Sequence, residues 1–236
     1  MQSSETGTLW ENRFGKVDRR FHERVSEMLA LDFAPVDLVH QFPLFTGHVN
    51  LGRYLALYEA YKLVSARSGH LADVGTWMGT SFLFAAKLVR LFEPHTTTRV
   101  HAFDWFQGMD PEDADKSGNY RGSYESLKKL VEIQELEDVA VLHQLDLRSE
   151  LDDFAASDQY REIRFKYVFM DCGLKEVLEV AVPFFWDRLL PGGVMLFDHF
   201  STDVPAESSV VLNALPEDSE FRQFTFTRQP TAYVIK

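Results

Sequence analysis

Apolar residues in this chain alternate between short continuous runs and helical spacing, and the alternation begins at about residue 71. The short runs predict buried strands, and stretches with apolar positions three or four residues apart predict helices between them. Strands are expected from Leu71 and at 100–104, 139–143, 165–171 and 194–198. Helices are expected at 80–89, 123–134, 149–156, 174–190 and 207–215. Pro183 would kink or restart the helix at 174–190.

Regular strand–helix alternation predicts an α/β fold with a parallel sheet. We expect a Rossmann-like doubly wound sheet that is mostly parallel, with helices on both faces. Two further β-rich segments, 221–227 and 231–235, are joined by Arg228-Gln-Pro. They predict a C-terminal antiparallel hairpin at the sheet edge.

The N-terminal quarter has a different pattern. Residues 9–31 carry apolar side chains at helical spacing and predict an amphipathic helix, and 33–45, with two prolines, predict a loop or short helix. Asn50 is expected to cap a second helix that ends near Gly69. We therefore divide the chain into a helical cap or lid at 1–69 and one Rossmann-like unit at 70–236.

Composition limits the possible functions. Thirty-six acidic residues against 24 Lys and Arg give a formal net charge of −12, which disfavours nucleic-acid binding. No stretch approaches the ~20 apolar residues of a membrane span, and the N-terminus lacks a charged start followed by an apolar run. Cys172 is the single cysteine, so an intrachain disulfide and a cysteine zinc site are excluded. A cytoplasmic location is the default expectation.

The first strand leads into a glycine turn with the pattern D-x-G-x-x-x-G, formed by Asp73, Gly75 and Gly79. Glycine tolerates positive φ and lets a ligand approach the backbone. Thr80 and Ser81 then place hydroxyls at the start of a helix, where free N–H groups can face a polar ligand. The pattern also suits an ordinary strand–helix turn in any α/β protein, so downstream residues must decide.

Aspartates follow the other strands: Asp104, Asp171 and Asp198 at strand ends, and Asp146 just past another. In an open parallel sheet, ligands lie outside the carboxyl ends of the strands. Asp104 ends the strand after the glycine turn, where an acid can accept hydrogen bonds from both hydroxyls of a nucleoside ribose. The aromatic residues that follow it, Trp105 and Phe106, could flank an adenine or belong to the core.

The segment from Leu189 to Asp198 contains a helix end, a Pro-Gly-Gly turn and a buried strand. Together with the glycine turn and Asp104, it resembles the class I S-adenosylmethionine-dependent methyltransferases over about residues 71–200. More narrowly, Asp-Val-Gly-Thr-Trp-Met-Gly-Thr-Ser at 73–81 is similar to the E-x-G-V-W-x-G-G loop of the macrocin O-methyltransferase family. Phe-Asp-Trp-Phe-Gln-Gly-Met at 103–109 is similar to that family's D-S-F-x-G-L.

The resemblance implies an S-adenosylmethionine-binding methyltransferase domain at 70–236 and a role in metal-dependent methylation of sugar hydroxyls. It places cofactor binding at Asp73, Gly75, Thr76, Trp77, Gly79, Ser81, Asp104, Trp105 and Asp146. It places catalysis and the divalent metal at Asp171, Asp198 and His199. Magnesium is the expected ion, with manganese or another divalent metal as alternatives because His199 offers nitrogen. Self-association into a homo-oligomer is also implied.

Two residues depart from the family pattern. Gly173 stands where the family has a second acid that serves as general base, and His199 replaces the second acid of the metal-binding pair. His199 could ligate the metal, act as the base, or only cap a strand end. Lys175 could contact substrate or face solvent, and Cys172 is expected to be a packing residue.

The leading hypothesis is a metal-assisted O-methyltransferase for a hydroxyl of a small natural product, specifically a sugar. One alternative is a metal-independent small-molecule methyltransferase with His199 as base. Another is a catalytically inactive methyltransferase-like binding or partner protein, suggested by Gly173. A nicotinamide oxidoreductase is disfavoured because the turn lacks G-x-G-x-x-G, and because the Tyr58–Lys62 spacing precedes the nucleotide turn.

Overall fold

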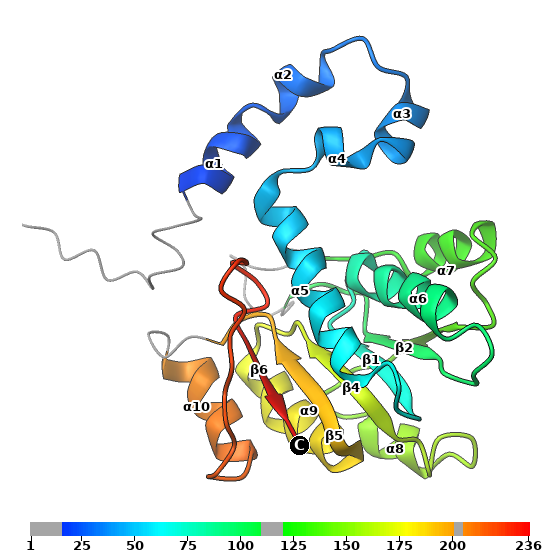
Figure 1. The fold of residues 1–236 in the computed structure, drawn as a ribbon. Helices are drawn as coiled ribbons and strands as arrows, with labels where there is room; N and C mark the ends of the chain where they lie inside the picture. Colours follow the sequence, from blue (N-terminus) through cyan, green and yellow to red (C-terminus); the bar gives the residue numbers. More distant parts are fainter. Residues whose placement is uncertain (1–15, 110–119, 201–204) are drawn as a thin grey trace, which may run out of the picture.

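A six-stranded sheet with the order β3-β2-β1-β4-β5-β6 forms the centre of the molecule (Figure 1). The computed structural model describes residues 16–109, 120–200 and 205–236. The strands are β1 (His70–Val74), β2 (Val100–Asp104), β3 (Ala140–Gln144), β4 (Phe165–Met170), β5 (Leu189–Phe197) and β6 (Ala232–Ile235). The first five strands pair in parallel, and β6 pairs antiparallel with β5. The predicted doubly wound, mostly parallel sheet is confirmed.

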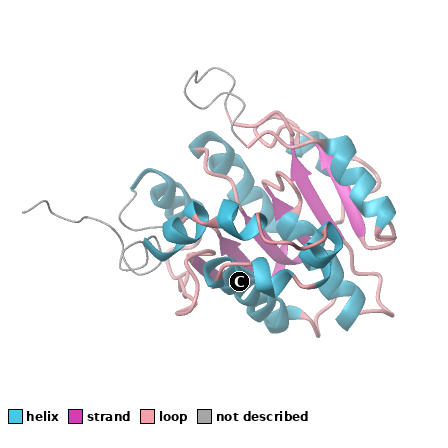
Figure 2. Ribbon diagram, turned by 90° about the horizontal axis from the view of Figure 1, so that it is seen from above, coloured by secondary structure: helices cyan, strands magenta, loops and turns pink. Residues whose placement is uncertain are grey.

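Helices cover both faces of the sheet, as Figure 2 shows. One apolar core lies under α5 (His48–Val64), α6 (Thr80–Phe92) and α7 (Tyr124–Ile133). The other lies under α8 (Leu151–Ala156), α9 (Lys175–Arg188) and α10 (Pro205–Ala214). Strands β4 and β5 are largely apolar, as expected for central strands that are buried on both faces. Pro183 lies inside α9, which is assigned as one continuous helix.

The C-terminal antiparallel edge differs in detail from the expected hairpin. Strand β6 pairs with β5 over four positions, but the segment 221–227 contributes only one isolated bridge, between Arg222 and Tyr233. The chain turns at 225–226 and bends at 228–230, so the segment does not stay extended beside β6.

The N-terminal helices lie beyond the carboxyl ends of the strands, at the top of Figure 1. The predicted helix at 9–31 is broken in its described part, where α1 (Lys16–Glu23) and α2 (Val25–Leu29) are separated at Arg24; residues 9–15 lie outside the described residues. The short helices α3 (Pro35–His40) and α4 (Phe42–Phe45) follow. None of the helices within the described ranges is long and apolar enough to cross a membrane.

Helix α5 begins earlier than expected. Gly47, with extended backbone at φ −62° and ψ 147°, is the N-cap, so the prediction that Asn50 caps this helix is wrong. Asn50 instead lies within the first turn of α5 and faces the cleft described below. The correction matters for function because it places one face of α5, with Asn50, Arg53 and Tyr54, over the strand ends.

Candidate active site

A cleft of about 950 Å³ opens at the carboxyl ends of the strands. Its walls come from the segments that follow β1 to β5 and from α5. The predicted site residues that line it are Gly75, Thr76, Trp77, Ser81, Asp104, Trp105, Asp146, Asp171, Asp198 and His199. The volume is within the usual range for small-molecule sites. The structure therefore brings residues from five separate loops into one cavity.

The glycine turn after β1 has the close packing that the sequence predicts. Gly75 has φ +86°, and a side chain there would collide with the backbone carbonyl of Asp171. Gly79 also has φ +86°, forms the N-cap of α6, and packs against Leu127. Only glycine satisfies both the backbone angle and the available space at these two positions.

Asp73 and Gly79 are the predicted cofactor residues that do not line the cleft. Asp73 lies beneath the turn, 3% exposed, and its carboxylate accepts a hydrogen bond of 2.7 Å from the Thr76 hydroxyl. Burial raises the pKa of Asp73 to about 6, while hydrogen bonds from Ser81 and Thr76 act to lower it. Asp73 thus stabilises the glycine turn from a buried position and does not line the cleft.

Asp104 holds two strained backbone segments together. One carboxylate oxygen accepts the Trp77 N–H at 2.7 Å, and the other accepts the Phe106 N–H at 2.6 Å. Both residues have positive φ, +50° for Trp77 and +63° for Phe106, which is uncommon for side chains of this size. Burial raises the pKa of Asp104 more than these hydrogen bonds lower it. Each oxygen keeps a second lone pair that a ribose hydroxyl could use.

The aromatic residues after β2 have separate roles. Phe106 is 3% exposed and belongs to the core, whereas Trp105 lines the cleft. The Trp105 indole N–H donates to the Gly108 carbonyl at 2.6 Å, and the Arg148 guanidinium lies 4.7 Å from its ring centroid. Arg148 also forms a forked ion pair with Asp146, which lowers the pKa of that acid. Arg148 was not predicted as a site residue.

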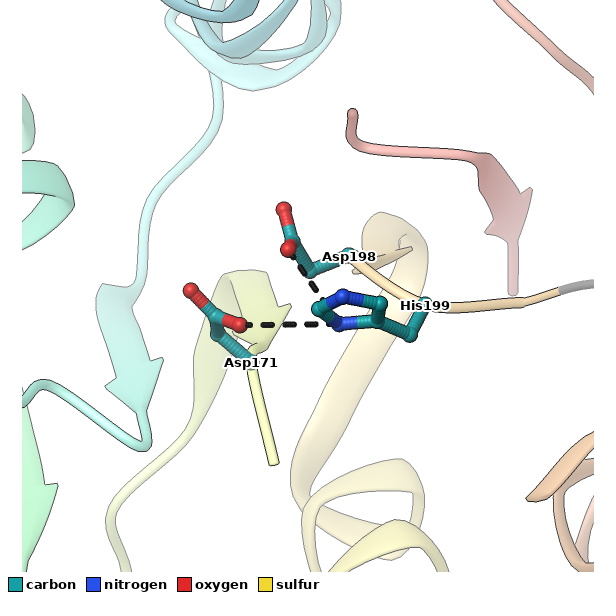
Figure 3. Close-up of side chains that lie close together, drawn as sticks. All are labelled: Asp171, Asp198 and His199. Atoms are coloured by element: carbon teal, nitrogen blue, oxygen red, sulfur yellow. Dashed lines mark ion pairs between the residues drawn. The ribbon is translucent and has the colours of Figure 1, made fainter. Parts of the chain in front are cut away.

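Asp171, Asp198 and His199 converge at the ends of the adjacent strands β4 and β5 (Figure 3). His199 Nδ1 lies 3.3 Å from one oxygen of Asp198 and 4.0 Å from one oxygen of Asp171. One ligand atom from each residue lies within 4.8 Å of the others. Two carboxylates and an imidazole suit a divalent cation, so this donor set fits the predicted ion.

Arg53 of α5 binds the same two carboxylates. Its Nη2 donates to the second oxygen of Asp171 at 2.8 Å, and its Nη1 donates to the second oxygen of Asp198. Burial and the charge of Asp171 raise the pKa of Asp198 well above its ordinary value, and Arg53 opposes this shift. The sequence contains no signal for this contact, because Arg53 lies more than one hundred residues before both partners on a helix outside the recognised motifs.

Both nitrogens of the His199 ring have polar neighbours. Nδ1 faces the two aspartates, and Nε2 lies 2.8 Å from the side-chain amide of Gln229. Gln229 lies in the loop before β6 and was not predicted as a site residue. A contact of this kind selects the tautomer and orientation of an imidazole.

The remaining candidate residues contribute little polar chemistry. Gly173 lines the cleft but has no side chain. Burial and the neighbouring aspartates raise the pKa of the Cys172 thiol well above its ordinary value, which agrees with packing rather than reactivity. Lys175 is exposed and lies 3.4 Å from Glu179, so it faces solvent rather than the cleft.

Comparison with known proteins identifies the family. A family model described as "Methyltransferase domain" matches residues 72–200, more than half of the chain. No curated protein matches the sequence.

Solved structures with similar folds agree with this assignment. CalS11, a calicheamicin methyltransferase, aligns with a TM-score of 0.78 and 18% identity over 100% of this chain and 94% of that chain. An apo structure of CalS11, described as a TDP-rhamnose 3'-O-methyltransferase, aligns with a TM-score of 0.74 and 19% identity over 100% and 96%. The O-methyltransferase NovP aligns with a TM-score of 0.65 and 17% identity over 81% and 83%. The chain therefore belongs to the methyltransferase domain family and has the Rossmann-like fold of class I S-adenosylmethionine-dependent methyltransferases.

Proposed function

We propose that the protein is an S-adenosylmethionine-dependent O-methyltransferase that acts on a hydroxyl of a small natural product, specifically a sugar. The observation that carries this proposal is one cleft that joins the glycine turn to the Asp171, Asp198 and His199 cluster. CalS11 and NovP are both described as methyltransferases, and CalS11 as a TDP-rhamnose 3'-O-methyltransferase, which supports the same class of substrate.

The half of the cleft beside β1 and β2 suits the methyl donor, which supplies an electrophilic methyl group on its sulfonium. Gly75 borders the cleft where the donor's amino-acid part would lie, and Asp104 would accept the ribose hydroxyls. Trp105 and Asp146 border the next part of the cleft, where an adenine would lie. Positioning by these residues lowers the entropic cost of bringing the two reactants together.

The half beside β4, β5 and α5 suits the acceptor. We propose that Asp171, Asp198 and His199 hold a divalent metal, which when bound lowers the pKa of a coordinated hydroxyl. The chain's own contribution is to aim one oxygen of each aspartate and His199 Nδ1 at the same point. The Gln229 amide nitrogen lies 2.8 Å from Nε2, and a hydrogen bond donated to Nε2 places the ring proton on Nδ1. Nδ1 would have a lone pair for the metal once the Gln229 amide is turned so that its oxygen accepts from Nε2–H.

A metal-independent reaction is the second candidate, and the Arg53 contact favours it. Arg53 already offsets part of the negative charge of the aspartate pair. In this version His199 takes the proton from the acceptor hydroxyl, and Asp198 stabilises the imidazolium that forms.

Calorimetry and methyl transfer test these proposals in sequence. Titration with S-adenosylmethionine should give saturable binding, and the absence of binding at millimolar cofactor would refute the methyltransferase proposal. Transfer of a labelled methyl group should then be measured against free and nucleotide-linked sugars. Activity that survives excess EDTA would select the metal-independent reaction. Cofactor binding without transfer to any acceptor would select the inactive binding protein.

We also propose that residues 1–69 act as a cap over the acceptor half, because α5 forms one wall of the cleft and α1–α4 lie beyond it (Figure 1). Removal of 1–46 should weaken acceptor binding more than cofactor binding. The homo-oligomer, the cytoplasmic location and the absence of nucleic-acid and membrane partners stay predictions.

A further inference from the structure

We propose that Arg53 is a resident counter-cation of the Asp171–Asp198 pair, which lowers the affinity of this pair for a divalent metal. This inference rests on the metal site proposed above and extends it to a residue outside the recognised motifs. It predicts that the metal binds weakly and exchanges readily, and that the positive charge of Arg53 is what lowers the affinity for the metal.

The Arg53 guanidinium contacts both aspartates at the same time. The two Arg53 nitrogens reach two different carboxylates, Nη2 to Asp171 and Nη1 to Asp198. Each aspartate then has one oxygen on Arg53 and its other oxygen toward His199 Nδ1. A planar guanidinium suits such a two-oxygen contact better than a lysine ammonium does. Arg53 and a metal would therefore share the carboxylates rather than exclude each other.

Burial makes the contact persistent. The side chain of Asp198 is 2% exposed, while those of Asp171 and Arg53 are 27% and 23% exposed. The Arg53 guanidinium also lies 5.4 Å from the centroid of the Phe169 ring, on the strand that carries Asp171. A guanidinium stays protonated under all physiological conditions. The positive charge therefore stays beside the acids whether or not a metal is bound.

Charge balance gives the consequence. A bound metal requires both carboxylates in their ionised form, in which the pair carries two negative charges, and Arg53 offsets one of them. A divalent ion would then feel both the attraction of the acids and the repulsion of the guanidinium. Even at the dielectric constant of water, removing a positive charge a few ångström away should strengthen binding by about tenfold or more.

Titration with Mn²⁺, followed by electron paramagnetic resonance of the free ion, measures this affinity directly and does not depend on turnover. At pH 8, Arg53→Met should bind Mn²⁺ about tenfold more tightly than wild type. Arg53→Lys keeps the charge and should stay within about threefold of wild type. Lys62→Met removes the same charge from an exposed position of the same helix and should leave the affinity unchanged.

Equal or weaker Mn²⁺ binding by folded Arg53→Met would overturn the proposal, and so would an equal gain in Lys62→Met. Arg53→Gln, which is uncharged but still donates a hydrogen bond, repeats the measurement if the methionine variant does not fold. Circular dichroism and S-adenosylmethionine calorimetry on every variant separate the two proposals. Loss of cofactor binding in wild type would refute the proposed function, whereas unchanged Mn²⁺ affinity with normal cofactor binding would refute only the role of Arg53.

Discussion

Replacement of Asp73 by Asn should change how the stability of the protein depends on pH. The carboxyl is 3% exposed and has a pKa of about 6, compared with 3.8 in an unperturbed aspartate. Because the folded state raises the pKa, this group contributes stability that is fully present below pH 3.8 and is lost as pH rises through 6. A shift of about two units corresponds to about 3 kcal/mol. Asparagine cannot ionise, so the variant should not lose this contribution.

Urea unfolding at pH 4, 5, 6 and 7, followed by tryptophan fluorescence, measures the effect. The difference in unfolding free energy, Asp73→Asn minus wild type, should grow by about 2 kcal/mol between pH 4 and pH 7, because part of the loss has already occurred at pH 4. Burial lowers the pKa of His143 to about 4, which gives stability the opposite slope in both proteins and cancels in the difference. Asp158→Asn, at a side chain that is 98% exposed, is the matched control and should show no such trend.

A difference that stays constant within about 1 kcal/mol from pH 4 to pH 7 would refute the reasoning. The variant can still form both local contacts, since the amide oxygen can accept from Thr76 and the amide nitrogen can donate to Ser81. A general loss of structure would therefore not explain a flat result. The same variant should bind S-adenosylmethionine within a few-fold of wild type, because Asp73 lies outside the cleft lining.

Three further substitutions test the site. Gly75→Ala should destabilise the protein by about 3 kcal/mol or more, measured by thermal unfolding, because the new methyl group meets the Asp171 carbonyl at φ +86°; a stable variant would show that the turn is not tightly packed. Asp104→Asn should weaken S-adenosylmethionine binding by about tenfold in calorimetry, since an amide cannot accept at both positions; unchanged affinity would argue against ribose binding there. His199→Ala should weaken Mn²⁺ binding by about tenfold or more, because it removes one of the three proposed ligands; an unaltered affinity would remove His199 from the proposed ligands.

The sequence could predict the sheet and the position of its acids for one physical reason. Parallel strands end at the same edge, so the aspartates after successive strands meet there whatever their separation in the chain. Asp104, Asp171 and Asp198 line one cleft as expected. The antiparallel edge was also predictable, but apolar alternation does not specify the turn at 225–226, which leaves 221–227 with one isolated bridge to β6.

Contacts made by α5 and by the loop before β6 could not be predicted. The carboxylate partner of Arg53 is determined by where α5 crosses the strand ends, which is a property of packing and not of local pattern. Gln229 likewise reaches His199 only through tertiary structure. The start of α5 was misjudged because Asn is a common N-cap, whereas the extended backbone at Gly47 provides the cap here.

The close approach of Gly75 to the Asp171 carbonyl couples the two halves of the cleft through main chain alone. Substitution of side chains elsewhere therefore leaves unchanged the spacing between the glycine turn, in the methyl-donor half of the cleft, and Asp171, in the acceptor half. New acceptor preferences would then arise from side chains of α5 and of the loop containing Gln229, which border the cavity. Evolution of such a scaffold can diversify its acceptors while the alignment needed for transfer is inherited unchanged.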